Sequence, residues 1–579
     1  MARQDSPTDF NFAHERAEPI HGEPVQGVDL ENDSGAFLPQ DDSLETPLLP
    51  VAVDGINRGH AASTKVAAQD KGWATAFKLN VVVTIIAAVC FGKMAIDAVA
   101  NDSLSGGGRR RLQRVHGAPE DEDGYDVFSV VFQGVLLLGT AGVVSAGVLL
   151  SLLHCSRGVL LTAFGFSAGI WAVAAFVSAL CLPLFYVLIP AIVFAVIVRA
   201  IKKRWHRIEF GAANLQVAAM AIKAMPWTIW SAVAMSMVQL VWCLVAGIAA
   251  LGSFVALETV TAPDGASYRA IDCLSGVFDE PDASSPVTST APGSVCMCSG
   301  DKISDESCNF SGYGVPLAIV WLMSMSWGCV VIGNVVACTV NGSVASWWFT
   351  PNEDPSPVKG AYNRATNCSF GSLCKAAVAQ KVMGAVHAVA NHMLTFVPCA
   401  SFLLSWADQA VKYILAYAVC FIGVYGLSFN ESGRRVHELF KRRALTTVAN
   451  DVVVDFGLGL LAFSASLIYM IVAMTVFMAS ITSSDGHDVD GVELLSSLGC
   501  LVFGWVACLL FVKTSLEVFR SGFKTVFVCF VQDPDALAEK HDPQVHHGLN
   551  AAWLNMQAAS RPAAVGARSA QGYAPVRVN

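Results

Sequence analysis

The sequence has 579 residues and a net charge of −9; 54% of its residues are hydrophobic and only 14% are charged. Soluble globular domains carry about 25% charged residues, so this composition excludes an ordinary soluble protein. Several stretches of about 18 or more residues contain few charges, which is long enough for a helix to cross the roughly 30 Å hydrocarbon core of a bilayer. The sequence therefore predicts an all-α polytopic membrane protein.

The two ends of the chain differ from its middle. Residues 1–72 and 536–579 are polar, and the first of these segments is acidic, rich in proline and glycine, and lacks the apolar stretch of a signal peptide. We expect each to be a disordered cytosolic tail, with residues 73–535 forming the membrane domain. The chain has no basic stripe interleaved with aromatic residues, so we expect no nucleic-acid partner.

Ten apolar stretches predict transmembrane helices, and an even number of membrane crossings places both termini on the same side of the membrane. Basic residues accumulate in cytosolic loops, and the basic segments 202–207 and 434–443 follow the fourth and eighth stretches. We therefore expect both termini to be cytosolic, although the basic run 109–114 falls in an outside loop. The ten stretches are 74–98, 127–152, 159–180, 182–201, 226–253, 313–340, 370–398, 411–429, 451–480 and 495–514.

The loop 255–312 lies outside the membrane by this count and is rich in cysteine. It also contains the glycosylation sequon Asn309-Phe310-Ser311. Disulfides need an oxidising compartment, and four cysteines permit three pairings that the sequence does not separate. A zinc site is the alternative, but the loop has no histidine, so we expect no metal. The four cysteines are Cys273, Cys296, Cys298 and Cys308.

Two adjacent tryptophans, Trp347 and Trp348, end the sixth stretch, where amphipathic rings typically anchor a helix at the membrane interface. The surrounding sequence GSVASWWFTP resembles a signature of the choline transporter-like family, which also contains the yeast pH-nine-sensitive protein. Further stretches resemble that family in the same order along the chain. They are IKAMP at 222–226, FGSL at 370–373 followed by Gln380, VYGLSF at 424–429, DVVVDF at 451–456 and TVFVCFVQD at 525–533.

The resemblance implies a carrier that moves choline or a related quaternary or primary amine through the bilayer by alternating access. It implies no enzyme activity and no cofactor. We expect the plasma membrane as its location, with an internal membrane as the alternative. Departures from the family pattern, such as Leu427 in place of lysine and Asn430 in place of cysteine, leave the substrate open. The oligomeric state is also open.

A choline site needs aromatic faces around the trimethylammonium group and a polar group for the hydroxyl. Four tryptophans fall near the middle of predicted helices, although packing between helices would also explain them. Polar side chains in the family-like stretches supply candidates for the other wall, and Gln380 can both donate and accept; an interhelical hydrogen bond is the alternative. The candidates are Trp171, Trp242, Trp327, Trp505, Ser372, Gln380 and Tyr425.

Ionisable side chains within membrane helices are costly and are therefore functional candidates. His387 and His392 could carry a coupling proton, and Asp455 could balance a cationic substrate. A neutral hydrogen-bonded histidine and an ion pair of Asp455 with Arg442 or Arg443 are the alternatives. Coupling is not required, because one charge crossing 100 mV gains about 2.3 kcal/mol, which supports roughly 50-fold accumulation.

Other classes of membrane protein remain as alternatives. The sequence has no Walker motif, Gly-x-Ser-x-Gly elbow or His-Glu-x-x-His pattern, so we expect no ATP-driven pump or membrane hydrolase. An ion channel, a non-transporting scaffold and a carrier for ethanolamine are the competing hypotheses. A scaffold would not need polar and aromatic side chains that converge on a cavity.

Overall fold

The computed structural model describes most of the chain, and all the described residues fall within Pro50–Asn579. Met1–Leu49 lies outside the described residues, as do the cysteines Cys273, Cys296, Cys298 and Cys308. The described residues are 68–113, 127–181, 184–203, 205–261, 267–269, 309–310, 312–351, 355–393, 398–482 and 491–560.

Helices make up almost all of this structure, as the composition predicts. The long ones are α1 (Lys71–Gln113), α2 (Val127–Cys181), α5 (Trp227–Leu257), α7 (Gly314–Phe349), α10 (Pro398–Tyr425), α11 (Phe429–Thr482) and α12 (Gly491–Gln532). The shorter ones are α3 (Leu184–Lys203), α4 (Trp205–Ala224), α8 (Pro357–Asn363), α9 (Phe370–Met393), α13 (Asp535–Lys540) and α14 (Pro543–Ser560), with a π-helical turn at Arg364–Cys368.

Six of these helices, within the described residues, are long and apolar enough to cross a membrane, or seven if one bent pair counts as a single span. One of the six is Gln133–Leu180, whose 48 residues contain two predicted spans on either side of a kink at Cys155. The predicted span 370–398 falls on the less apolar α9, and 182–201 falls on α3, whose apolar part is only Pro190–Arg199. The chain is therefore an all-α polytopic membrane protein.

The bent pair has a clear local cause. Ala410–Tyr425 and Phe429–Glu438 meet at 113°, and the break contains Gly426, whose φ of 68° lies in the left-handed region that glycine adopts without steric cost. The hydroxyl of Ser428 accepts a hydrogen bond from the backbone N–H of Glu431 at 3.4 Å, which caps the new helix. The predicted span 411–429 thus ends in a sharp turn.

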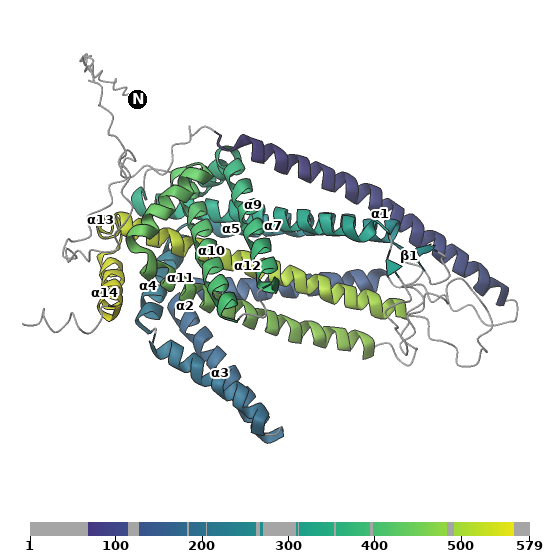
Figure 1. Cartoon of the computed structure of the whole chain (residues 1–579), viewed down its shortest axis with the longest axis horizontal. Coiled ribbons are helices and arrows are strands. Elements are labelled where there is room, and N and C mark those ends of the chain that lie inside the picture. Colours follow the sequence, from purple (N-terminus) through teal and green to yellow (C-terminus); the bar gives the residue numbers. More distant parts are fainter. Residues whose placement is uncertain are drawn as a thin grey trace, which may run out of the picture. The chain divides into compact units, whose positions relative to one another are not determined.

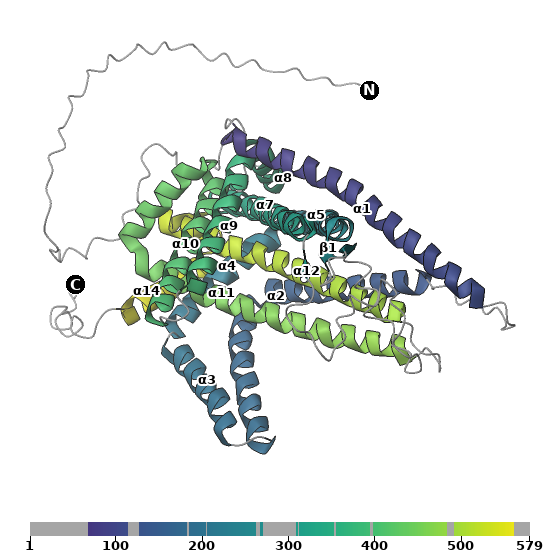
Figure 2. The ribbon, with the colours of Figure 1, turned by 45° about the vertical axis from the view of Figure 1, so that its right-hand side comes forward.

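The helices pack closely around α12, which runs between α7 and α11 in Figures 1 and 2. Glycine permits a close approach between α7 and α10. A Cβ atom on Gly423 would lie 2.8 Å from the carbonyl oxygen of Cys338 and 2.7 Å from the Cβ of Asn341. Gly423, which directly precedes the motif at 424–429, therefore has a packing role.

The C-terminal segment differs from the expected disordered tail 536–579, because α13 and α14 extend to Ser560. Trp553 of α14 is buried against Phe210 of α4, with ring centroids 5.2 Å apart. Trp348 is also fully buried, and its indole N–H donates to the carbonyl of Asp533 at 3.2 Å. It is a core residue, so the prediction that it anchors at the interface is wrong. Trp347 is partly buried and stacks on His541 at 3.9 Å.

A small three-stranded sheet lies at the opposite end of α5 and α7. Strand β1 (Thr259–Thr261) pairs antiparallel with β2 (Ser267–Arg269) and with β3 (Asn309–Phe310). The sequon residue Asn309 is therefore opposite Thr261, just beyond the end of α5. The buried Glu258 accepts hydrogen bonds from the backbone N–H groups of Gly312 and Val315, which caps the start of α7.

Candidate functional site

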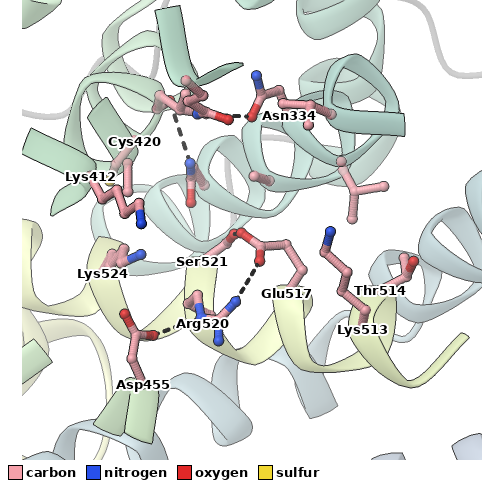
Figure 3. Close-up of a pocket in the computed structure, with 18 of the residues that line it drawn as sticks. Asn334, Lys412, Cys420, Asp455, Lys513, Thr514, Glu517, Arg520, Ser521 and Lys524 are labelled. Atoms are coloured by element: carbon pink, nitrogen blue, oxygen red, sulfur yellow. Dashed lines mark hydrogen bonds and ion pairs between the residues drawn. The ribbon is translucent and has the colours of Figure 1, made fainter. Parts of the chain in front are cut away.

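A cavity of about 410 Å³ lies among the middle parts of six helices, α5, α7, α9, α10, α11 and α12. Figure 3 shows it from close range, with α12 along one wall. Its polar lining includes amides, hydroxyls and ionised groups. They are Gln239, Asn334, Asn341, Gln380, Tyr413, Thr514 and Ser521, together with Lys412, Asp455, Lys513, Glu517, Arg520 and Lys524.

Helix α12 supplies a row of charged side chains to this cavity. Lys513, Glu517, Arg520 and Lys524 follow one another at spacings of four, three and four residues. These spacings place side chains on one face of an α-helix, because it has 3.6 residues per turn. The row extends about 16 Å along the helix axis at 1.5 Å per residue. The cavity therefore meets a continuous charged stripe on an otherwise apolar helix.

Arg520 lies at the centre of an ion-pair triad. Its Nε atom is 2.6 Å from Oδ1 of Asp455 on α11, and its Nη1 atom is 3.1 Å from Oε2 of Glu517. The other oxygen of Glu517 accepts from the hydroxyl of Ser521 at 3.4 Å. Two carboxylates share one guanidinium, so the triad carries a net charge of −1.

Three lysines complete the ionised lining. Lys412 reaches the cavity from α10, and Lys513 and Lys524 reach it from α12. Lys524 is only 6% exposed, yet in the described part of the chain it makes neither an ion pair nor a hydrogen bond. The described lining therefore contains four basic and two acidic side chains, a net charge of +2.

Amide side chains connect the helices around the cavity. Gln380 of α9 donates to Oδ1 of Asn334 on α7 at 3.4 Å, and Asn334 donates to the carbonyl of Leu373 at 3.3 Å. About two turns further along α7, Asn341 accepts from the hydroxyl of Thr525 at 2.9 Å. The lining is thus a set of weakly linked polar groups that can rearrange around a solute.

Two residues predicted from the sequence, Gln380 and Asp455, line this cavity. Asp455 pairs with Arg520, whereas the sequence suggested Arg442 or Arg443, whose side chains lie outside the described ones. The histidines His387 and His392 lie further along α9 and do not line it. The interhelical hydrogen bond expected as the alternative for Gln380 is also present.

The four predicted tryptophans do not line this cavity. Trp242 packs against Gly328 and donates its indole N–H to the carbonyl of Met325 at 3.2 Å. Trp327 makes an edge contact with Phe77 of α1, with ring centroids 5.2 Å apart. Trp171 and Trp505 are 37% and 40% exposed on the surfaces of their helices.

These tryptophans therefore pack between helices or face outward. The sequence indicates how deep along its helix a residue lies, but not which side of the helix it occupies. Among the described residues that line the cavity, Tyr413 is the aromatic one. The aromatic cage expected for choline is not assembled here.

Ser372 and Tyr425 also lie apart from the cavity lining. The hydroxyl of Ser372 donates to Oδ2 of Asp70 at 2.7 Å, and that oxygen also accepts from the backbone N–H of Phe429 at 3.3 Å. The phenol of Tyr425 donates to Gln532. Both residues hold helices together: Ser372 joins α9 to the segment before α1, and Tyr425 joins α10 to the end of α12.

The sequence interpretation missed the charged face of α12, because it ended the tenth span at residue 514. A signal was present: the pattern K-x-x-x-E-x-x-R-x-x-x-K from Lys513 to Lys524 keeps one helical face charged within apolar surroundings. Such charges are tolerated in a membrane helix when they face a polar cavity. Among the described residues, no three His, Cys, Asp or Glu side chains gather as a metal site.

Comparisons with known proteins agree with the resemblance seen in the motifs. The family described as plasma-membrane choline transporter matches residues 188–535, which include all the residues that line the cavity. A CTL-like protein of Dictyostelium discoideum is 27% identical over 241 residues, 39% of this chain and 41% of that protein. Protein PNS1 of Saccharomyces cerevisiae is 23% identical over 254 residues, 41% of this chain and 46% of that protein.

Protein PNS1 of Candida glabrata is 24% identical over 261 residues, 42% of this chain and 46% of that protein. The chain therefore spans less than half the length of each of these three curated relatives.

Proposed function

Because this chain belongs to the plasma-membrane choline transporter family, we propose that it carries choline or a related organic amine across a membrane by alternating access. The family supports a transporter of a small molecule in a membrane, and the choice of substrate is our own. We further propose the arrangement of ten membrane crossings with cytosolic termini, and the plasma membrane as the location.

The observation that carries this proposal is the polar cavity among six helices. Its volume of about 410 Å³ lies within the range of pockets that hold small organic ligands, roughly 300–1,000 Å³. It meets α7 between Cys329 and Asn341 and α12 between Lys513 and Lys524, in the middle of both helices. Substrate sites of transporters lie near the bilayer midplane, where helices are often interrupted.

The interrupted pair α10 and α11 provides an element that alternating access can use. The turn at Gly426 joins Ala410–Tyr425, which contributes Lys412 and Tyr413 to the cavity, to Phe429–Glu438. A left-handed glycine in a turn of 113° is a natural hinge, since it changes backbone angles at low steric cost. We propose that this turn flexes as the cavity opens to either side.

The proposal leaves coupling as either uniport or ion-driven transport. Of the ion-coupling candidates, Asp455 is the one that lines the cavity, and it is held by Arg520 at 2.6 Å. His387 and His392 lie outside the lining, so a proton carried by either would act at a distance from the solute. The membrane potential alone can drive a cation, as calculated above.

Uptake by the purified full chain in liposomes tests the proposal. Labelled choline, ethanolamine and phosphocholine are offered with and without a membrane potential, and saturable uptake of at least one amine is expected. Gln380→Ala removes an amide from the cavity wall and should lower uptake about ten-fold. Gln133→Ala is the matched control, because Gln133 is a buried glutamine of α2 that does not line the cavity.

The competing classes give different results in the same liposomes. An ion channel would show flux that does not saturate, together with ionic conductance. A scaffold would move none of the solutes, and that result would refute the carrier. Equal loss of uptake in Gln380→Ala and Gln133→Ala would show that the cavity is not the site.

A further inference from the structure

The charges in the cavity indicate more about the solute than the family does. Resting on the proposed function, we propose that the preferred cargo is a zwitterionic amine, which carries a phosphate or carboxylate group beside its ammonium group. The side chains of Lys412 and Lys524 would bind the anionic group, and the Asp455–Arg520–Glu517 triad would face the ammonium group.

Lys524 makes the strongest case for an anion. It is 94% buried by its 6% exposure, it lines the cavity, and its ammonium group has neither an ion pair nor a hydrogen bond among the described residues. The rest of the side chain is buried while the ammonium group is open to the cavity, and a lysine ammonium without a protein partner favours an anionic ligand. Lys513 also lines the cavity without an ion pair or hydrogen bond in the described structure, but it is exposed and lies beyond Glu517 on α12.

Among the described residues, the two carboxylates form no ion pair with Lys513 or Lys524. Asp455 and Glu517 both contact Arg520, at 2.6 and 3.1 Å, so the nearest positive charge to each is the guanidinium. The lining keeps a net charge of +2. A solute with only a positive charge therefore enters a region of its own sign, and few aromatic faces are present to offset that repulsion.

A zwitterion suits both parts of the lining. The triad carries a net charge of −1 and links α11 to α12, where the carboxylate of Asp455 points toward Arg520 (Figure 3). Lys412 and Lys524 reach the cavity from α10 and α12, on the left in Figure 3, and Glu517 of the triad lies to their right. Charge-assisted hydrogen bonds from lysine to phosphate or carboxylate are about twice as strong as neutral ones. Binding both ends of the solute orients it along the cavity.

Competition in the wild-type liposomes is the first test. Uptake of labelled choline is measured against unlabelled choline, phosphocholine, glycine betaine and inorganic phosphate. We expect phosphocholine or glycine betaine to inhibit at concentrations at least ten-fold lower than choline. Choline as the best competitor would overturn the inference. Inorganic phosphate competing as well as phosphocholine would also overturn it, since the amine would then play no part.

Substitution of Lys524 provides the second test. Lys524→Gln removes the charge and should reduce the advantage of the zwitterion over choline, measured as a ratio within the same variant, at least ten-fold. Lys223→Gln is the matched control, because Lys223 is an exposed lysine of α4 away from the cavity. Lys412→Gln repeats the test at a more exposed position in case Lys524→Gln does not fold. An unchanged preference in both cavity variants would refute the inference.

The two proposals fail in different ways. If no amine is transported or competes, the carrier function itself is wrong. If choline is transported in a saturable manner and zwitterions have no advantage, the carrier function stands and only the charge argument is wrong. Melting temperatures of each variant, measured in the same detergent, exclude misfolding as the cause.

Discussion

Helix α12 has two faces that differ in charge and in how tightly they pack. One face carries Lys513, Glu517, Arg520 and Lys524 into a polar cavity. The other is fully buried: Gly522 packs against α4, and the amide of Asn214 on α4 donates to the backbone carbonyl of Phe523 at 3.3 Å. The residues of this packed face include Val518, Phe519, Phe523 and Val526, each 0–1% exposed.

The contrast shows how a membrane helix can hold charges at a fixed position. In a bilayer, packing and shape complementarity between helices contribute most of the association, because lipid tails are as apolar as the side chains. The packed face therefore determines the position and rotation of α12, and the rotation determines where the charged row points. Substitutions on the packed face should change stability, whereas those on the charged face should change recognition.

The largest expected effect is on the packed face. Phe519→Ala removes a fully buried ring and leaves a cavity between α12 and its neighbours, which should lower the free energy of unfolding by about 3 kcal/mol. Thermal or denaturant unfolding in detergent measures the loss. Phe463→Ala is the control, because that ring is 57% exposed on α11. Equal losses in the two variants would show that the face assigned to packing is wrong.

The next largest effect tests the boundary between stability and recognition. Arg520→Gln leaves Asp455 and Glu517 facing each other without a cation, which should destabilise the protein by about 2 kcal/mol. Adding Asp455→Asn removes one of the uncompensated charges and should recover part of the loss. If the double variant is no more stable than the single one, the triad is not the electrostatic unit that the distances indicate.

The smallest expected effect concerns the packed end of the molecule, outside the membrane-spanning segments. Burial lowers the pKa of His541, which stacks on Trp347 and hydrogen-bonds to its carbonyl. A lowered pKa in the folded state means that the neutral ring stabilises docking above its ordinary pKa of about 6.5. This contribution is lost as the pH falls below that value.

Tryptophan fluorescence and hydrogen exchange of α14 between pH 7.5 and pH 5.5 measure this change. We expect faster exchange at the lower pH, and His541→Gln should make exchange independent of pH over this range. A wild-type protein whose exchange in α14 does not respond to pH would contradict the docking role of His541.

Part of the site can be predicted from the sequence, because the polarity of single residues within apolar stretches indicates it. Gln380 and Asp455 are polar residues within apolar stretches. Because an unpaired polar or charged side chain in a membrane costs free energy, each is expected to face polar partners. The tryptophans show the limit of the same reasoning. Trp242 and Trp327 have suitable depth, but contacts with distant parts of the chain determine their positions: the backbone of Met325 and Gly328 for Trp242, and the ring of Phe77 for Trp327.

The sequence by itself determined the membrane class, the family and the helical nature of the chain, because apolar length and local motifs are properties of continuous segments. It also contained the charged row on α12, since helical periodicity is local. Only the tertiary structure decided that this row faces Asp455 of α11, Lys412 of α10 and Asn334 of α7 across one cavity. The physical reason is that helix rotation depends on the packing of the opposite face, and that packing involves residues hundreds of positions apart, such as Asn214 and Phe523.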